Sequence, residues 1–387
     1  MLNIHFNHRL ILSACLCVSV NFLLAQSSLK LKYNNSTVYS GIEVGSKGVK
    51  MSMVELGKNA QSNGSFNILK DTSVNTDFIS FNESTFSATL NALCGLYATA
   101  QKVYKIPDKR IFTAISSGVK MQAEKDEKTE LVKKLIDSFK IRINDQSRVV
   151  TVIDVKQEAL LSHLGIVPES RRYSTFLIDI GSGNTKGGYF PYGNTKDFYL
   201  FQLNWGTKST SNAAEKRIEE DKSLGNYQKQ LTRTLSQAEN SDIIYAVNAS
   251  GAYPLSDYIA FSGGAAWAAA NLMHPELVDN AVISVSFDEV VKFYERLYTS
   301  FPTYSPENLS KVSEDKTEKA AIMKAAKTVH GVFDQKSLMA GVGLLLKIMR
   351  QFSSIYETKQ FYLVKNGQVG WISAYVDQSQ QGMTATK

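Results

Sequence analysis

Residues 43–50 read Glu-Val-Gly-Ser-Lys-Gly-Val-Lys, and residues 179–186 read Asp-Ile-Gly-Ser-Gly-Asn-Thr-Lys. The two octapeptides align without a gap at an offset of 136 residues and share an acid, an aliphatic residue, Gly-Ser and a final lysine. Each follows an apolar run that predicts a strand, at residues 38–44 and 176–180, and each leads into a second predicted strand. Agreement at so many restrictive positions, in matching contexts, indicates two related lobes.

A Gly-Ser turn between two strands exposes backbone N–H groups and a hydroxyl, which suits it to hold phosphate oxygens. The preceding acid, Glu43 or Asp179, would then lie beside the phosphate, where a carboxylate is useful if Mg²⁺ or a polarised water lies between them. Either loop alone is more simply an ordinary hairpin that needs glycine for a positive φ. The repeated pair, facing each other across a cleft, favours phosphate binding.

The rest of the chain alternates predicted strands and helices, which indicates an α/β protein. Helices are predicted for residues 85–104, 128–139, 157–164, 212–237, 287–298, 318–329 and 338–352, with an Ala-rich helix after Gly264. Further strands are predicted for residues 49–54, 110–115, 149–155, 243–247 and 258–261, with a closing hairpin at 360–375 and a frayed C-terminal end. We place lobe I at residues 26–168 and lobe II at residues 169–387.

The composition fits a globular protein of two domains. The chain has 387 residues, of which 43% are hydrophobic and 20% charged, so it can bury sizeable cores, and wholesale disorder is excluded. The formal net charge of +7 hints at an anionic partner, but it is modest for this length, and the basic residues are scattered among acidic ones. We therefore expect no nucleic-acid partner, and we leave a homodimer open.

The first 25 residues have the features of a secretory signal peptide. Arg9 precedes an apolar run from Leu10 to Ala25, and a polar stretch begins at Gln26. The run is short for a membrane span, so we expect export to the periplasm with cleavage near Ala25, and no stable membrane insertion afterwards. An uncleaved anchor is one alternative, and lipidation at Cys15 within a lipobox-like segment is another.

Other phosphate-binding and metal-binding patterns fit poorly. The sequence has no P-loop motif. Residues 181–183 begin like a dinucleotide fingerprint, but the chain continues as a predicted strand where a Rossmann loop must open a helix. The histidines beyond the predicted signal, His163, His274 and His330, are far apart in sequence, so a histidine-based metal site is not expected.

The duplicated strand–loop–strand units resemble those of the actin, sugar kinase and Hsp70 superfamily. Within it, residues 41–375 are most similar to the exopolyphosphatase/guanosine pentaphosphate phosphatase family. The family loop D-L-G-S-N-S-F-R corresponds to residues 43–50, T-S-A-x-R to 116–120, S-G-x-E-E-A to 154–159, and D-I-G-G-G-S-T-E to 179–186. Three later segments also correspond, namely Gly206-Thr207-Lys208, Ser262-Gly263-Gly264 and Gly341-Val342-Gly343-Leu344-Leu345.

The resemblance implies two actin-like, ribonuclease H-like lobes around a central phosphate-binding cleft, and hydrolysis of a terminal phosphoanhydride. Glu158 would act as general base or position the attacking water, and Mg²⁺ would bridge the phosphate to Asp179 and Glu43. The implied phosphate-binding residues are Gly45, Ser46, Lys47, Lys50, Ser117, Lys120, Gly181, Ser182, Gly183, Asn184, Thr185 and Lys208.

The chain departs from the family pattern at positions that bear on chemistry: Glu43 replaces Asp, Lys50 and Lys120 replace Arg, Ser182 replaces Gly, and Lys186 replaces an acid. Lysine lacks the bidentate grip of arginine on phosphate, so these changes weaken the case for catalysis more than the case for the fold.

Expected export favours inorganic polyphosphate as substrate over cytoplasmic nucleotides, although a nucleoside polyphosphate stays open. Two other functions fit the same fold. One is a phosphate or nucleotide sensor without turnover. The other is a kinase of the same superfamily, in which the turn at residues 262–264 would receive adenosine.

Overall fold

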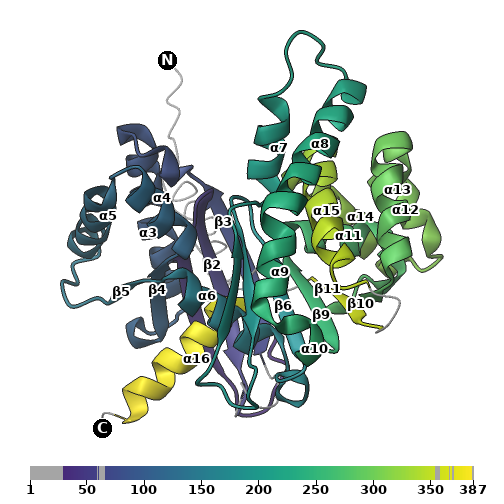
Figure 1. The fold of residues 1–387 in the computed structure, drawn as a ribbon. Helices are drawn as coiled ribbons and strands as arrows, with labels where there is room; N and C mark the ends of the chain where they lie inside the picture. Colours follow the sequence, from purple (N-terminus) through teal and green to yellow (C-terminus); the bar gives the residue numbers. More distant parts are fainter. Residues whose placement is uncertain are drawn as a thin grey trace, which may run out of the picture.

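Two α/β lobes make up the computed structural model, which describes residues 29–58, 60, 66–353, 358–365, 367 and 370–385 (Figure 1). The first lobe has a five-stranded sheet of order β3-β2-β1-β4-β5, and the second has a six-stranded sheet of order β10-β11-β9-β6-β7-β8. The predicted signal peptide, with Cys15, lies outside the described residues. No helix among the residues described is long and apolar enough to cross a membrane.

The two sheets share the same strand topology, apart from one added edge strand in the second sheet. The first sheet consists of β1 (Thr37–Val44), β2 (Gly48–Leu56), β3 (Phe66–Asn75), β4 (Ile111–Ile115) and β5 (Val150–Val152). The second consists of β6 (Thr175–Ile180), β7 (Thr185–Tyr189), β8 (Tyr199–Leu203), β9 (Tyr258–Gly263), β10 (Val282–Val285) and β11 (Gln360–Val364). In each sheet the first three strands form an antiparallel meander. A later strand, β4 or β9, pairs in parallel with the first strand of the meander, and a further strand, β5 or β11, pairs in parallel with that one. The strand β10 is an antiparallel addition at the far edge of the second sheet.

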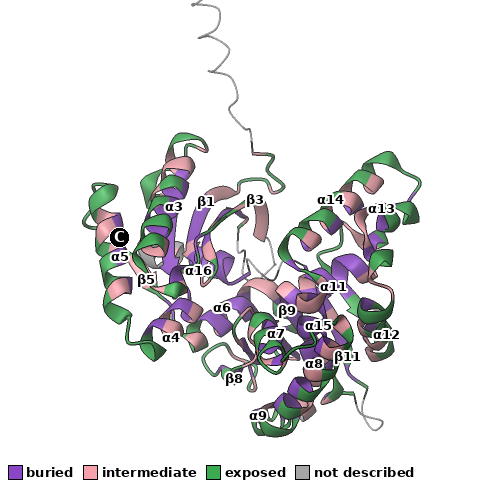
Figure 2. Ribbon diagram, turned by 90° about the horizontal axis from the view of Figure 1, so that it is seen from above, coloured by how far each residue is buried: buried purple, intermediate pink, exposed green. Residues whose placement is uncertain are grey.

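Helices cover the outer faces of both sheets. In the first lobe these are α3 (Glu83–Lys102), α4 (Ser117–Lys125) and α5 (Thr129–Arg142). In the second lobe the longer ones are α7 (Thr207–Glu215), α8 (Leu224–Ala238), α11 (Gly264–Met273), α12 (Phe287–Thr299), α14 (Lys316–Val332) and α15 (Gln335–Arg350), with the short α10 (Ala252–Leu255) and α13 (Pro306–Leu309) between them. Burial concentrates in the inner strands of each sheet and in α11 and α15, while exposed residues line α5, α12 and α13 (Figure 2).

Two helices join the lobes. The helix α6 (Val155–Ile166) follows the first sheet and packs on β7 of the second, whereas α16 (Gly370–Ala385) follows the second sheet and packs on β1 of the first (Figure 1). They cross at two glycines, because a Cβ atom on Gly165 would lie only 1.9 Å from the carbonyl oxygen of Gly370. Side chains of α6, α16 and both sheets share one apolar cluster, so the contact between the lobes is itself a packed core.

The closing hairpin predicted at 360–375 is wrong in its second half. Residues 360–364 form β11 as expected, but α16 begins at Gly370 and continues to Ala385, where the sequence predicted a frayed end. Trp371, Ile372 and Val376 are all buried between α6 and the first sheet. A short apolar run that is buried all round has the same pattern in a strand and in a helix, so periodicity could not separate them.

The strand predicted at 243–247 is also wrong. A π-helix occupies Glu239–Ile243, and α9 (Ile244–Ser250) follows it without a break. Glu239 is buried, and its carboxylate accepts hydrogen bonds from Lys347 at 2.9 Å, from Arg350 Nε at 2.7 Å and from Gln351. These contacts with the end of α15 hold the segment helical, a tertiary effect that the local apolar run does not reveal.

Smaller differences concern boundaries and omissions. The helix predicted at 212–237 is two helices, α7 and α8, and the strand predicted at 149–155 is shorter, at Val150–Val152. The strands β3, β8 and β10 and the helix α4 had no counterpart among the predicted elements.

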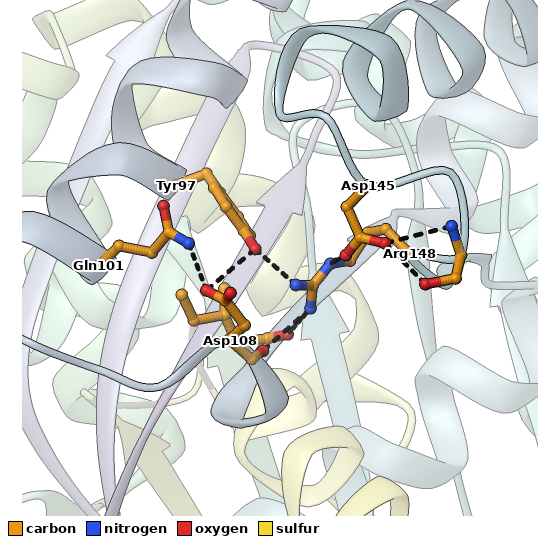
Figure 3. Close-up of polar contacts among 7 residues, drawn as sticks. Tyr97, Gln101, Asp108, Asp145 and Arg148 are labelled. Atoms are coloured by element: carbon orange, nitrogen blue, oxygen red, sulfur yellow. Dashed lines mark hydrogen bonds and ion pairs between the residues drawn. The ribbon is translucent and has the colours of Figure 1, made fainter.

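Arg148 fixes the amino end of β4. Its guanidinium donates to the carbonyl oxygens of Asp108 and Ile111 at 3.0 and 3.1 Å, and it pairs with Asp145 at 3.1 Å (Figure 3). The same group donates to the hydroxyl of Tyr97 on α3. This cluster ties α3 and the loop before β5 to the start of β4, and so orients the strand whose other end carries Ser116 and Ser117.

Candidate functional site

The two repeated loops are equivalent hairpin turns. The Gly45 N–H donates to the Gly48 carbonyl at 2.8 Å, and the Gly181 N–H donates to the Asn184 carbonyl at 3.0 Å. Glu43 stands opposite Lys50 in the register of β1 and β2, as Asp179 stands opposite Lys186 in β6 and β7. The repeat therefore gives each loop a carboxylate and a lysine at its base.

Loop 1, residues 45–47, lies against the beginning of α4. The Ser116 N–H donates to the Val44 carbonyl at 3.0 Å, and a Cβ atom on Gly118 would lie 3.0 Å from Ser46 Oγ. The sequence predicted Ser46 and Ser117 as neighbours at the phosphate, and the structure brings their segments together. Ser117 is fully buried beside Glu158, so its hydroxyl lies where loop 1 meets that carboxylate.

Loop 2, residues 181–184, lies against α7. The Thr207 N–H donates to the Gly181 carbonyl at 2.9 Å, and the Lys208 N–H donates to the Ser182 carbonyl at 2.8 Å. The loop also reaches the first lobe, because Asn184 Nδ2 lies 3.8 Å from Met121 Sδ on α4. Both loops thus meet at α4, although 136 residues separate them in the sequence.

Glu158 lies between the two lobes. Asp154 caps α6 by accepting the Gln157 N–H at 2.7 Å, and this places Glu158 in the first turn of the helix. Glu158 is 3% exposed as a residue. Its Oε2 accepts the Ser117 N–H of the first lobe at 2.8 Å, and its Oε1 lies 2.7 Å from Lys186 Nζ of the second.

These contacts keep the Glu158 carboxyl ionised. Burial opposes ionisation, but the Lys186 ammonium and the hydrogen bonds from the Ser117 hydroxyl and N–H outweigh it and hold the pKa of Glu158 below its usual value. The pKa of Lys186 is raised in turn, because Glu158 and Asp179 outweigh the burial of its ammonium. A carboxylate of low pKa is a poor proton acceptor, so the arrangement suits Glu158 to orient a water molecule more than to deprotonate it.

Three carboxylates and two lysines form one electrostatic group at this point. Its members are Glu43, Lys50, Glu158, Asp179 and Lys186, and each of the other four acts on the ionisation of Glu43. Burial raises the pKa of Glu43 to about 7, against the opposing charge of Lys50. Burial also raises the pKa of Asp179, against the opposing charge of Lys186. The positive charges of Lys50 and Lys186 therefore compensate the three carboxylates only in part. Additional positive charge nearby would stabilise the ionised forms of Glu43 and Asp179.

This donor set bears on the predicted magnesium site. No group of three or more His, Cys, Asp or Glu side chains within the described part of the chain could hold a metal ion. Mg²⁺, however, is commonly bound by one or two carboxylates together with phosphate oxygens and water. Glu43 and Asp179, two acidic groups with raised pKa values, fit that role if the ion arrives with a phosphate ligand.

The other predicted lysines lie nearer the surface. Lys47 at the tip of loop 1 and Lys208 at the start of α7 are exposed, and they come from opposite lobes. Partial burial and the charge of Lys208 lower the pKa of Lys47, which places the two ammonium groups in each other's field. Lys120 lies on α4, half-buried, with its ammonium 3.9 Å from Glu124.

The polar groups of some predicted phosphate ligands are used within the fold, as the Gly45 and Gly181 N–H groups are in the hairpins and the Thr185 hydroxyl is in the second lobe. Thr185 is fully buried, and its hydroxyl donates to the Trp205 carbonyl at 2.7 Å. Its single hydroxyl proton is therefore used within the second lobe. The sequence pattern could not show this, because the carbonyl belongs to a segment 20 residues away.

Gly263 completes the surroundings of Asp179. It has φ +88°, and a Cβ atom there would lie 2.4 Å from Asp179 Oδ1. Glycine is required on both counts, so the turn at residues 262–264 approaches the carboxylate with its backbone. The sequence singled out this turn, and the structure places it beside loop 2 at the end of β9.

Lys186 is the central residue that the sequence did not select. It was noted only as a departure from an acidic family position, yet its ammonium contacts Glu158 and is 7% exposed as a residue. The sequence did contain an indication of its importance. The repeat aligns Lys186 with Lys50, and each lysine stands opposite the acidic residue of its own predicted hairpin. What the sequence could not provide is the position of Glu158 across the interlobe contact.

Comparison with solved structures agrees with this architecture. A Ppx/GppA family member from Aquifex aeolicus superposes with a TM-score of 0.55 at 15% identity, covering 89% of this chain and 99% of that one. An exopolyphosphatase from Cytophaga hutchinsonii gives a TM-score of 0.56 at 13% identity, covering 88% and 98%. The chain has the Ppx/GppA fold. An exopolyphosphatase-like protein gives a similar result, a TM-score of 0.55 at 12% identity with 89% and 99% covered.

The Ppx/GppA fold confirms the expected two-lobed, actin-like architecture over nearly the whole described chain. No protein-family model and no curated protein matches the sequence. The fold is thus shared with these solved structures at 12–15% sequence identity.

Proposed function

We propose that the protein is a phosphoanhydride hydrolase of the exopolyphosphatase type, which releases the terminal phosphate of a polyphosphate or nucleoside polyphosphate. The observation that carries this proposal is Glu158, held between two duplicated Gly-Ser loops by one contact from each lobe. A buried carboxylate with both oxygens fixed is a preorganised group, and phosphoryl transfer depends chiefly on positioning and charge. The Ppx/GppA fold supports the same reaction class.

The residues divide the work as follows. The backbone N–H groups of loops 1 and 2, other than those of Gly45 and Gly181 that close the hairpins, bind the oxygens of the terminal phosphate together with the loop hydroxyls. Glu158 retains acceptor capacity beyond its two contacts, and it orients a water for in-line attack on the phosphorus. Glu43 and Asp179 would hold Mg²⁺, whose chemistry is to neutralise charge on the phosphate oxygens. Lys47 and Lys208 attract the rest of the polyanion.

A second function is favoured by one specific observation. The Lys186 contact lowers the pKa of Glu158, and a site that binds phosphate without a competent base is a sensor. This alternative predicts magnesium-dependent binding without release of phosphate. Both functions use the same phosphate-binding residues and differ only in whether Glu158 takes part in hydrolysis.

The deciding experiment is phosphate release by the purified protein with Mg²⁺. Long-chain polyphosphate, tripolyphosphate, ATP and guanosine tetraphosphate are compared, each with wild type, Glu158→Gln and Glu169→Gln. Glu169 is an exposed residue shortly after α6 and serves as a matched control. Release that Glu158→Gln abolishes and Glu169→Gln preserves establishes the hydrolase and its substrate class. Binding without release would leave the sensor instead.

We also propose that the protein is exported to the periplasm, with cleavage near Ala25, where inorganic polyphosphate is the accessible substrate. The apolar run from Leu10 to Ala25 supports this proposal. Cell fractionation and N-terminal sequencing test it, and a diacylglycerol-modified Cys15 would show lipidation in its place.

A further inference from the structure

The Lys186 ammonium can donate more hydrogen bonds inside the site than the one that Glu158 accepts. Its ammonium has three N–H donors, and the residue is 7% exposed. Within the described residues, Glu158 Oε1 at 2.7 Å is the hydrogen-bond partner of this group, while Asp179 and Glu43 act on it through charge alone. The other two N–H groups are therefore available to an acceptor that enters the site.

The position of Lys186 specifies the acceptor. Lys186 is the second residue of β7, directly after loop 2, and it stands opposite Asp179 at the end of β6. A phosphate bound to the N–H groups of loop 2 is therefore adjacent to the Lys186 ammonium. A ligand that uses these donors must compete with three carboxylates for the ammonium, which favours oxygens of high charge density such as those of phosphate.

We infer that Lys186 is a substrate-binding catalytic residue, which donates to the terminal phosphoryl group while its third contact holds Glu158 against that group. The inference rests on the proposed function and goes beyond it. Lys186 supplies fixed positive charge at the reacting group, and neutralisation of developing charge is the main demand of phosphoryl transfer. Binding of the terminal phosphate then persists when divalent cations are removed.

The test compares two variants that differ only in Lys186. Calorimetric titration with tripolyphosphate in EDTA is carried out on wild type, Glu158→Gln and the double variant Glu158→Gln/Lys186→Met. Removing both charges leaves no unpaired carboxylate at position 158, which favours a folded protein. Lys109→Met is the matched control, since Lys109 is exposed just before the opposite, amino end of β4.

Wild type, Glu158→Gln and Lys109→Met are expected to bind tripolyphosphate without metal. The double variant should bind about ten- to hundredfold more weakly than Glu158→Gln, as expected for the loss of charge-assisted hydrogen bonds. Equal affinity of these two variants would overturn the inference and leave the hydrolase standing, and so would binding by wild type only with Mg²⁺. Failure of wild type to bind with or without Mg²⁺ would overturn both.

A second measurement needs no loss of charge. In protein labelled with ¹⁵N at lysine side chains, the Lys186 ammonium signal is assigned by its absence from Lys186→Arg. Saturation with tripolyphosphate should shift this signal while the Lys109 signal stays in place. A Lys186 signal unmoved at saturation contradicts the inference even if the double variant does not fold.

Discussion

Lys186 Nζ lies 2.7 Å from Glu158 Oε1, and this contact joins β7 of the second lobe to α6. The other oxygen of Glu158 accepts the Ser117 N–H at the start of α4 in the first lobe. One buried carboxylate therefore ties together three elements that converge on the site. Because the same group stabilises the interlobe contact and orients the proposed chemistry, stability and activity must be measured separately for substitutions here.

The first prediction concerns the stability of this ion pair. Lys186→Met should lower the free energy of unfolding by about 3–5 kcal/mol, since it leaves three carboxylates with less compensation. Glu158→Gln should cost less, about 1–3 kcal/mol, because Asp179 still faces the ammonium. The double variant should cost less than the sum. Urea unfolding at pH 7 measures all three, and strictly additive costs would show that the two residues do not interact.

The second prediction concerns the crossing of α6 and α16. Gly165→Ala should destabilise by about 2–3 kcal/mol, because the new methyl group would meet the Gly370 backbone, which has no flexible side chain to move away. Gly95→Ala in α3 is the matched control. A Cβ atom there meets nothing within 4 Å, so alanine should stabilise by about 0.5–1 kcal/mol through helix propensity. Thermal unfolding compares both, and equal melting temperatures would refute the close crossing.

The fold was predictable where local pattern and repetition agreed. The octapeptides at 43–50 and 179–186 identified both hairpins, and their register carried over residue for residue. Long amphipathic helices such as α3 and α5 were likewise found close to their true bounds. These elements depend on short-range periodicity and turn chemistry, which a sequence contains in full.

Features that depend on distant partners were not predictable. The buried face of α16 is defined by α6 and the first sheet, and α9 is held helical by contacts at the end of α15. The same limit applies to the site. The repeat identified Glu43, Asp179 and both loops, but only the interlobe packing brings Lys186 to Glu158.

The third prediction is a loss of stability in mild acid caused by His163. Its ring is fully buried with Nε2 3.0 Å from the Thr175 carbonyl oxygen, and burial lowers its pKa from 6.5 to about 4. Below pH 6.5, His163 is protonated in the unfolded chain but stays neutral in the folded chain. The free energy of unfolding therefore decreases as the pH falls from about 6.5 towards 4. The loss from this residue should reach about 3 kcal/mol.

Urea unfolding at pH 7, 5.5 and 4.5 measures this effect. His163→Gln is expected to be less stable than wild type at pH 7, but to lose less stability on acidification because the amide does not titrate. Parallel pH profiles of the two proteins would assign the acid sensitivity to other groups.

The last prediction concerns the two lysines that approach from opposite lobes. Lys47 lies on loop 1 and Lys208 is tied to loop 2 through its backbone N–H, and the charge of Lys208 helps to lower the pKa of Lys47. Two like charges in each other's field mark a place where a polyanion is stabilised. We expect them to bind phosphates beyond the terminal one.

Lys47→Met and Lys208→Met should each raise KM for tripolyphosphate by about tenfold while kcat stays constant, the signature of uniform binding. Pyrophosphate, which extends less far from the terminal group, should be affected less, and Lys109→Met should change neither substrate. A fall in kcat without a change in KM would place these lysines at the reacting phosphoryl group instead.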